Sequence, residues 1–211
     1  MRKNKLIKFS LVIFSLVFMT ASCQLSKKNC LPDQSILCKK AVSDWQASID
    51  YIIKSNFPPD YGYYKAVVWD EDFENAWVTK GRQINITKRL LDKLNVIGRI
   101  CVAAHELAHL KMGHYYSRIG IIIVNDKNTI PENTSNDTSA VNHYGIGSPV
   151  DIPEGFGINQ EIEADKMALK FIKQSGLNIN HYLQLLMYLQ GPKKDPNSLI
   201  FHRIVQIKKL R

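Results

Sequence analysis

Two histidines stand four residues apart inside an apolar stretch of this 211-residue chain. They are His105 and His109, and most of the residues between Ile100 and Leu110 are aliphatic or alanine. A stretch of this composition is expected to form a packed helix, on which residues four apart lie about one turn above each other. The fold must therefore bring two imidazoles close together on one helical face.

This spacing suits a metal site. Two imidazoles one turn apart can hold a single Zn²⁺, and Glu106 lies beside them, where it could act on a water molecule at the metal. With six histidines in the chain, an HExxH match is rarely an accident, least of all on a helix packed by aliphatic residues. The sequence therefore predicts a zinc centre at His105, Glu106 and His109.

A catalytic zinc also needs a third protein ligand. His114 is the nearest candidate, but on a continuous helix it would point about 180° away from His105, so we predict a helix-end residue there. A second acidic helix fits better, because Glu161 and Asp165 share a face from which Glu163 points away. Glu161 would ligate the metal, and Asp165 would accept the second N–H of a zinc-bound histidine. The alternative is a solvated acidic turn at a helix N-terminus.

The N-terminus has the organisation of an export signal. Four basic residues precede the apolar run 9–19, which is shorter than the roughly 20 residues that a membrane-spanning helix needs. Small residues and then Cys23 follow, as in a bacterial lipobox, so we predict a lipoprotein-type signal peptide at 1–22 and lipidation at Cys23. An uncleaved anchor and ordinary secretion are the alternatives. In each case the domain would be held at or beyond a membrane, and with the lipid anchor it would lie in the bacterial cell envelope, on the periplasmic side or at the cell surface.

The signal accounts for much of the charge of the chain. The sequence has 28 Lys and Arg against 19 Asp and Glu, and its net charge of +9 alone would suggest a nucleic-acid or anionic-surface partner. Residues 1–22 carry four of the positive charges and no acidic residue, which leaves +5 on the rest. The remaining basic residues are scattered and no recognition motif accompanies them, so no nucleic-acid partner is expected.

The mature chain is predicted to be a tether followed by one domain. Residues 23–38 are polar and suit a tether, in which Cys30 and Cys38 could form a disulfide or remain free thiols. A single domain would span 39–211, and a long irregular loop at 115–157 would be a lid over one face.

Periodicity assigns the elements of this domain, which would be α+β and mostly helical. Residues 41–53 have helical spacing, whereas 64–87 alternate with period two around a Lys80-Gly81 turn and predict a small antiparallel sheet. The other predicted helices run from Thr87 as cap to Leu94, from Val96 to Gly113, from Asn159 as cap to Ser175 before Gly176, and over about 180–190 and 198–209.

Several short segments stand out between roughly residues 65 and 205. These segments are 75–77 (NAW), 81–82 (GR), 84–87 (INIT), 90–91 (LL), 101–109 (CVAAHELAH) with His114, and 161–165 (EIEAD). Together they resemble a known family, the CAAX-prenyl-protease-like zinc metallopeptidases (HtpX- and BepA-like gluzincins), and correspond to its strand-turn-strand unit with the following helix, its metal helix and its third-ligand motif.

The resemblance implies a zincin-like fold, in which the HExxH helix and the ExxxD helix pack on the small sheet. It implies one Zn²⁺ per chain, held by His105, His109 and Glu161, with Glu106 as the general base. It also implies a catalytic or structural cation at Arg203. The family's histidine before that arginine is missing here, and His202 is only a neighbour.

These features predict a membrane-anchored zinc metalloendopeptidase in protein quality control of the cell envelope. Its partners would be a peptide or an unfolded or misfolded protein, and the membrane through the lipid anchor. If the strand at 82–87 is an exposed edge near the metal, it could bind an extended peptide by strand addition. The missing histidine favours an alternative, a peptidase-like zinc-binding chaperone or binding module that cleaves little. A structural lipoprotein with a chance motif is a third reading.

Overall fold

The predicted signal peptide, the predicted lipidation site and most of the predicted lid lie outside the part of the chain that the structure describes. This holds for residues 1–22, for Cys23 and for all but the ends of 115–157. In the described part, no helix is long and apolar enough to cross a membrane. The computed structural model describes residues 29–31, 34–118, 156–192 and 194–210.

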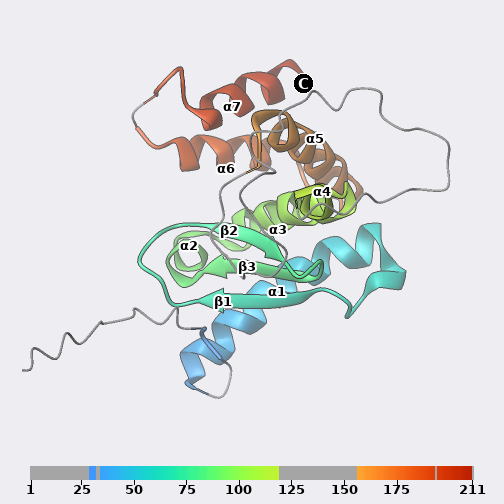
Figure 1. Cartoon of the computed structure of the whole chain (residues 1–211), viewed down its shortest axis with the longest axis vertical. Helices are drawn as coiled ribbons and strands as arrows, with labels where there is room; N and C mark the ends of the chain where they lie inside the picture. The colour runs from blue at the N-terminus through green and yellow to red at the C-terminus, as the bar shows by residue number, and fades with distance from the viewer. Residues whose placement is uncertain (1–28, 32–33, 119–155, 193, 211) are drawn as a thin grey trace, which may run out of the picture.

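The fold is α+β and mostly helical, as predicted, and its helices pack around a three-stranded sheet, with α1 (Ile36–Asn56) across one face. In Figure 1 the sheet and α1 lie at the bottom, α3 (Val96–Lys111) and α5 (Ile158–Gln174) above them, and α6 (Asn180–Gln190) and α7 (Leu199–Lys209) at the top. The two helices that carry the HExxH and ExxxD motifs are thus neighbours in the middle of the fold.

The sheet is mixed, not purely antiparallel as predicted. Strand β1 (Lys65–Trp69) runs parallel to β3 (Gln83–Thr87), and β2 (Ala76–Thr79) runs antiparallel to it, so the strand predicted as an edge is the central one. The connection 70–75 is long enough to step over one strand position, about 10 Å, which leaves a gap for β3. Alternation predicts strands but does not predict their order.

The turn between β2 and β3 forms where Lys80-Gly81 was predicted. Lys80 and Gly81 both have left-handed backbone angles, with φ of 51° and 67°, as tight hairpin turns require. Tyr116, in the short helix α4 (His114–Arg118), places its hydroxyl oxygen 3.5 Å from the Gly81 carbonyl oxygen. The chain that follows α3 is therefore packed on this turn.

Helix α1 begins inside the segment predicted to be a tether. Cys38, in its first turn, forms a disulfide with Cys30, which is the bonded alternative of the two considered. The backbone N–H of Cys30 donates a 2.8 Å hydrogen bond to the carbonyl of Val68 in β1. The chain is therefore joined to the domain from about residue 29 onward, ahead of the predicted boundary at 38. A short 3-10 helix, η1 (Pro58–Asp60), follows α1.

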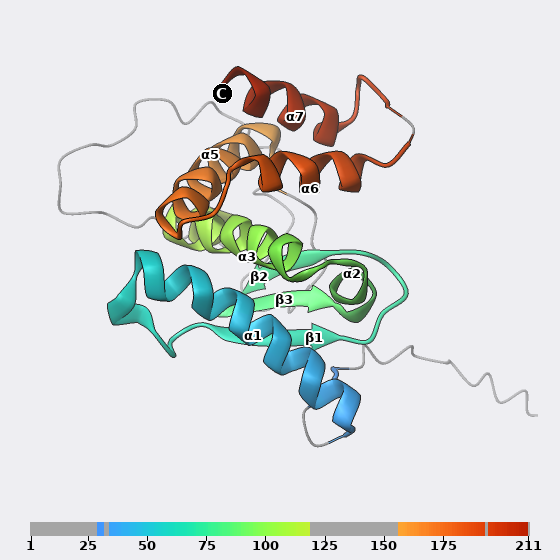
Figure 2. The same cartoon turned by 180° about the vertical axis from the view of Figure 1, so that it is seen from behind.

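Helices α1 and α3 pack together against the sheet (Figure 2). The fully buried Trp45 of α1 donates its indole N–H to the carbonyl of Ile84 in β3 at 2.8 Å, which ties helix and sheet together. Every residue of α3 from Ile100 to Leu110 is buried, because α3 lies between α1, the sheet and α5. The predicted histidine pair is therefore held in the interior.

Capping residues explain where the remaining helices begin and end. Thr87 caps α2 (Lys88–Lys93) as predicted, through its hydroxyl and the N–H of Leu90. The predicted cap at Asn159 is wrong, since α5 begins at Ile158 with Gly157 before it, and Asn159 falls in the first turn. Gly176, with φ of 77°, ends α5 as predicted.

Replacing Gly81 by alanine is expected to destabilise the protein by roughly 1–3 kcal/mol, because its left-handed angle disfavours a side chain. The new Cβ would also come within 2.5 Å of the Tyr116 hydroxyl oxygen. Gly62→Ala is the matched control, because Gly62 has φ of 82° but a Cβ there would meet nothing within 4 Å. Urea unfolding should show the larger loss for Gly81→Ala, and equal losses would contradict the Tyr116 contact.

Candidate metal centre

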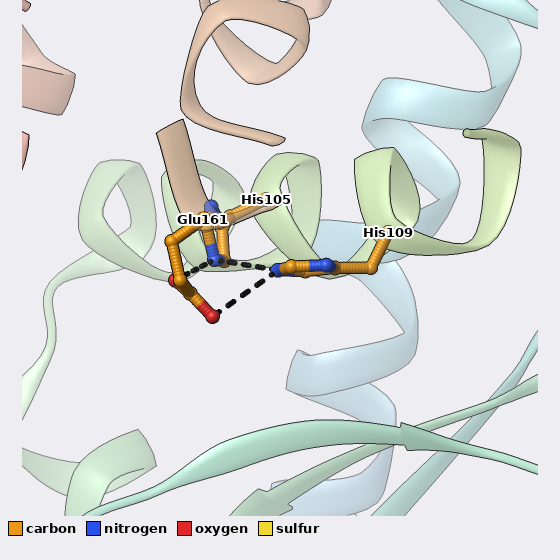
Figure 3. A group of neighbouring side chains, drawn as sticks. All are labelled: His105, His109 and Glu161. Carbon is orange, nitrogen blue, oxygen red and sulfur yellow. Dashed lines mark hydrogen bonds and ion pairs between the residues drawn. The ribbon is translucent and has the colours of Figure 1, made fainter. Parts of the chain in front are cut away.

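Three ligand atoms converge between α3 and the first turn of α5 (Figure 3). The Nε2 atoms of His105 and His109 lie 3.1 Å apart. Glu161 places Oε2 3.2 Å from Nε2 of His105 and Oε1 3.6 Å from Nε2 of His109. All three side chains are buried. The residues that the sequence predicted as ligands are therefore brought together, across a separation of more than fifty residues in the chain.

The spacing of these atoms fits a tetrahedral zinc ion. Bonds of about 2.0–2.1 Å to nitrogen and oxygen place the ligand atoms of a tetrahedral site about 3.3 Å apart. Two imidazoles and one carboxylate are also a donor set of catalytic zinc sites. Among the described residues, no other group of three histidine, cysteine or acidic side chains is arranged to hold a metal ion.

The balance of buried charge also favours a cation. Three buried carboxylates, those of Glu106, Glu161 and Asp165, share this region. In the described part of the chain, Arg203 is the one arginine or lysine placed among them, with its side chain 12% exposed. Buried carboxylates are costly unless they are paired, and a divalent metal ion would offset the excess negative charge. The alternative of a solvated acidic turn does not hold for Glu161 and Asp165.

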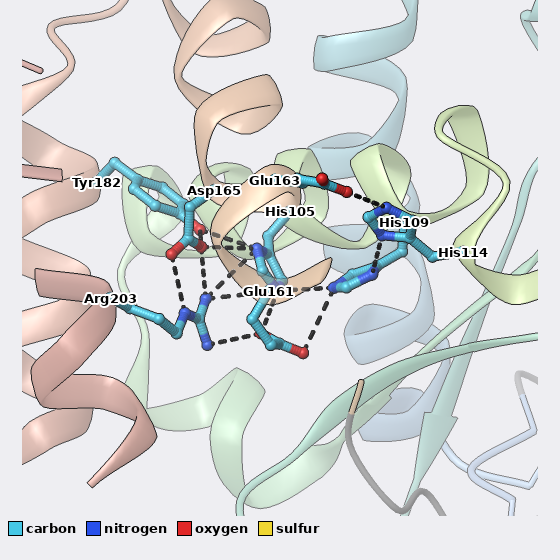
Figure 4. Close-up of polar contacts among 8 residues, drawn as sticks. All are labelled: His105, His109, His114, Glu161, Glu163, Asp165, Tyr182 and Arg203. Carbon is cyan, nitrogen blue, oxygen red and sulfur yellow. Dashed lines mark hydrogen bonds and ion pairs between the residues drawn. The ribbon is translucent and has the colours of Figure 1, made fainter. Parts of the chain in front are cut away.

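The second ring nitrogen of His105 faces two oxygen atoms (Figure 4). Its Nδ1 lies 3.1 Å from Oδ1 of Asp165, the partner predicted for a metal-bound histidine, and 2.9 Å from the hydroxyl of Tyr182. Tyr182 in turn donates its O–H to Asp165 at 2.6 Å. Tyr182 is fully buried and was not predicted, because in the sequence it is one aromatic residue of an apolar helix.

Arg203 of α7 joins two of the carboxylates. It donates from Nε and Nη2 to the two oxygens of Asp165, at 2.9 and 2.7 Å, and from Nη1 to Oε2 of Glu161 at 2.9 Å. Two parallel hydrogen bonds to a carboxylate are strong and fix its orientation. The neighbouring His202 is exposed, and its ring contacts the carbonyl of Ser198, so it lies away from the site.

His114 is closer to the site than predicted. Its Nδ1 lies 3.0 Å from Nδ1 of His109, and its Nε2 lies 3.2 Å from Oε2 of Glu163 (Figure 4). The prediction assumed a continuous helix, but α3 ends at Lys111 and Gly113 turns the chain with φ of 77°. His114 thus folds back onto the outer side of His109. Glu163 points away from the ligands as predicted, and it meets His114 there.

The surroundings shift the pKa values of the two histidines in opposite directions. Burial and the charge of Arg203 lower the pKa of His105, but hydrogen bonds with Asp165 and Glu161 outweigh them and raise it to about 9. Burial, followed by the charge of His105, holds the pKa of His109 far below its usual range. His109 is therefore neutral, as a metal ligand must be, and the carboxylates around His105 stabilise positive charge, as they would that of a metal ion.

The pKa values of the carboxyl groups of Glu106 and Asp165 are also shifted in opposite directions. Burial raises the pKa of Glu106 to about 7, although the charge of His105 opposes this. Burial would raise the pKa of Asp165 as well, but hydrogen bonds from His105 and Arg203 hold it well below its usual range. Asp165 therefore stays ionised, whereas Glu106 is able to gain and lose a proton near neutral pH.

A cleft of about 230 Å³ opens beside the ligands, and Glu106 lines it. The strand β2 contributes Ala76 and Trp77 to its wall. Most of its other residues are aliphatic and come from four helices. They are Leu90, Val102, Leu185, Leu186, Leu189 and Leu199. An apolar side chain of a ligand could therefore be bound next to the histidines.

Comparison with known proteins agrees with this geometry. Residues 44–203 match the model of a family described as Peptidase family M48. The match begins in α1, ends at Arg203 and includes the ligands, Glu106 and the cleft. A search of the curated proteins found no match.

His114→Ala is expected to weaken zinc binding by roughly 10- to 100-fold, because His109 would lose the partner that orients its ring. Zinc affinity is measured by competition with a chromophoric chelator, which does not depend on activity. His202→Ala is the matched control, since it removes an exposed histidine next to Arg203. If His114→Ala binds zinc as tightly as the control does, His114 does not orient the ligand.

Proposed function

Because the chain belongs to the M48 peptidase family, whose members are zinc metallopeptidases, we propose that it is a membrane-anchored zinc metalloendopeptidase of the HtpX- and BepA-like kind. The observation that carries this proposal is the placement of three ligand atoms at zinc spacing in one cleft with the buried Glu106. The role that we assign to it is quality control of proteins in the cell envelope.

In this proposal the residues of the cleft divide the work of peptide hydrolysis. Zn²⁺ bound by His105, His109 and Glu161 would supply a Lewis acid that polarises the peptide carbonyl and lowers the pKa of water. Glu106 accepts the proton of the attacking water and returns it to the leaving amine, and its place beside the two histidines in the cleft suits this role. Arg203 acts as a positioning residue, because its donors are already directed at Glu161 and Asp165.

The edge strand β2 is the proposed binding site for the substrate backbone. In the described sheet β2 has a partner strand on one side only, and its residues Ala76 and Trp77 line the cleft. An extended peptide could add to that free edge through main-chain hydrogen bonds, which read little of the sequence. The sequence suggested β3 for this role, but β3 is the central strand of the sheet, so we assign the role to β2.

The apolar wall of the cleft suggests which substrates are cleaved. Aliphatic side chains surround the space beside Glu106, so a leucine or phenylalanine next to the cleaved bond would be favoured. Such residues are buried in folded proteins and become accessible when a protein unfolds. The apolar cleft and the lipobox-like sequence before Cys23 together support a role in removing unfolded proteins at a membrane surface.

Glu106→Gln should retain about one zinc ion per chain and lose peptide cleavage by at least roughly 100-fold, because a neutral amide cannot accept the proton. Cleavage of unfolded casein and zinc content by mass spectrometry are the two measurements. Asp92→Asn, which changes an exposed carboxyl on α2, is the control and should keep both.

The same assay tests the binding-module alternative. That alternative expects the unaltered chain to bind zinc and unfolded protein without cleaving it, so that Glu106→Gln changes nothing measurable. A chain that neither contains zinc nor gains it on titration would contradict both readings.

Leu199→Glu should lower kcat/KM for peptides with leucine or phenylalanine at the cleaved bond by roughly 10- to 100-fold, because it places a charge in the apolar pocket. Leu199 is partly exposed, so the protein should still fold. Met187→Glu is the matched control, since Met187 is exposed on α6 but does not line the cleft. An equal effect of the two variants would show that the leucines do not select the substrate.

A further inference from the structure

Three large apolar side chains are exposed together where α1 begins. Leu31 is 46% exposed, Ile36 87% and Leu37 69%. The disulfide between Cys30 and Cys38, whose Cα atoms are 5.1 Å apart, holds Leu31 next to the first turn of the helix. We call these three residues the apolar tip. Exposed apolar groups of this kind commonly mark a surface that binds a partner or a membrane.

The length of chain before the tip favours a membrane as the occupant. Only residues 24–28 lie between Cys23, the proposed lipidation site, and Asn29, where the described structure begins. Fully extended, this segment spans at most about 20 Å. A lipid anchor at Cys23 would therefore keep the tip within about 20 Å of the bilayer surface, so the tip can reach the headgroup region.

The charge of the surrounding sequence points to the same occupant. Between residues 24 and 43 there are four lysines, Lys27, Lys28, Lys39 and Lys40, and one acidic residue, Asp33. Lys40 is paired with Asp44, but its side chain is still 70% exposed. Clusters of lysine beside apolar residues bind membranes that contain anionic lipids.

The position of the tip in the fold leaves the cleft accessible. In Figure 2 the first turn of α1 lies at the opposite end of the molecule from α6 and α7, which form part of the cleft wall. A bilayer at the tip would therefore lie away from these two helices.

We propose that the apolar tip of Leu31, Ile36 and Leu37 inserts into the headgroup region of an anionic bilayer and gives the domain a fixed orientation on it. This inference rests on the lipid anchoring proposed above. The anchor keeps the chain at the membrane, and the tip is a second contact that limits rotation about the tether.

The test uses the full chain with Leu37→Trp, bound to vesicles of phosphatidylethanolamine and phosphatidylglycerol. Brominated lipids should remove about half or more of the emission that the new tryptophan adds, as expected for a side chain about 5–10 Å into the interface. Met187→Trp, on exposed α6, is the matched control and should lose little. Adding Ile36→Asp to Leu37→Trp should abolish the quenching, which excludes an effect of tryptophan itself.

The outcomes separate this inference from the proposed function. A protein that floats with the vesicles but shows equal, weak quenching at both positions is anchored without a membrane-bound tip, which overturns the inference alone. A protein that does not float with the vesicles overturns both the lipid anchoring and the membrane contact of the tip. That result would not bear on peptide cleavage, which the casein assay measures separately. Weak quenching at Leu37 with a change in oligomeric size caused by Ile36→Asp would assign the tip to a protein partner instead.

Discussion

The site depends on the contact between α3 and α5. Because α5 packs across α3, the carboxylate of Glu161 reaches the two histidines, and Asp165 reaches the far side of His105. This contact buries several ionisable groups, which is unfavourable unless each one is paired. Arg203 and Tyr182 supply that pairing from α7 and α6. The C-terminal helices α6 and α7 therefore contribute to the candidate metal centre, as α3 does.

Each histidine ligand is held from a different direction. His105 is oriented by Asp165 and by the hydroxyl of Tyr182, whereas His109 faces His114, which is paired with Glu163 at the surface. Partners of this kind fix the tautomer of a ligand and the plane of its ring. The part of α5 that follows Glu161 thus contributes to both, with Glu163 on one face of the helix and Asp165 on the other.

Much of this arrangement could be predicted from the sequence, because helical spacing is a local property. The spacing of His105 and His109, and of Glu161 and Asp165, places each pair on one face whatever the rest of the fold does. The order of the strands could not be predicted, because alternation does not show whether β2 or β3 pairs with β1. His114 was misplaced because one glycine broke the helix, and Tyr182 was missed because only its tertiary partner reveals its role.

The disulfide at the start of the domain has a mechanical consequence. A force on the N-terminal chain meets the covalent bond between Cys30 and Cys38, together with the hydrogen bond from Cys30 to Val68, before it can unwind α1. The load is then shared between α1 and β1, and neither element supplies one of the three candidate metal ligands. A pull on the N-terminal chain would thus load α1 and β1 first, ahead of α3 and α5, which carry the two histidines and Glu161.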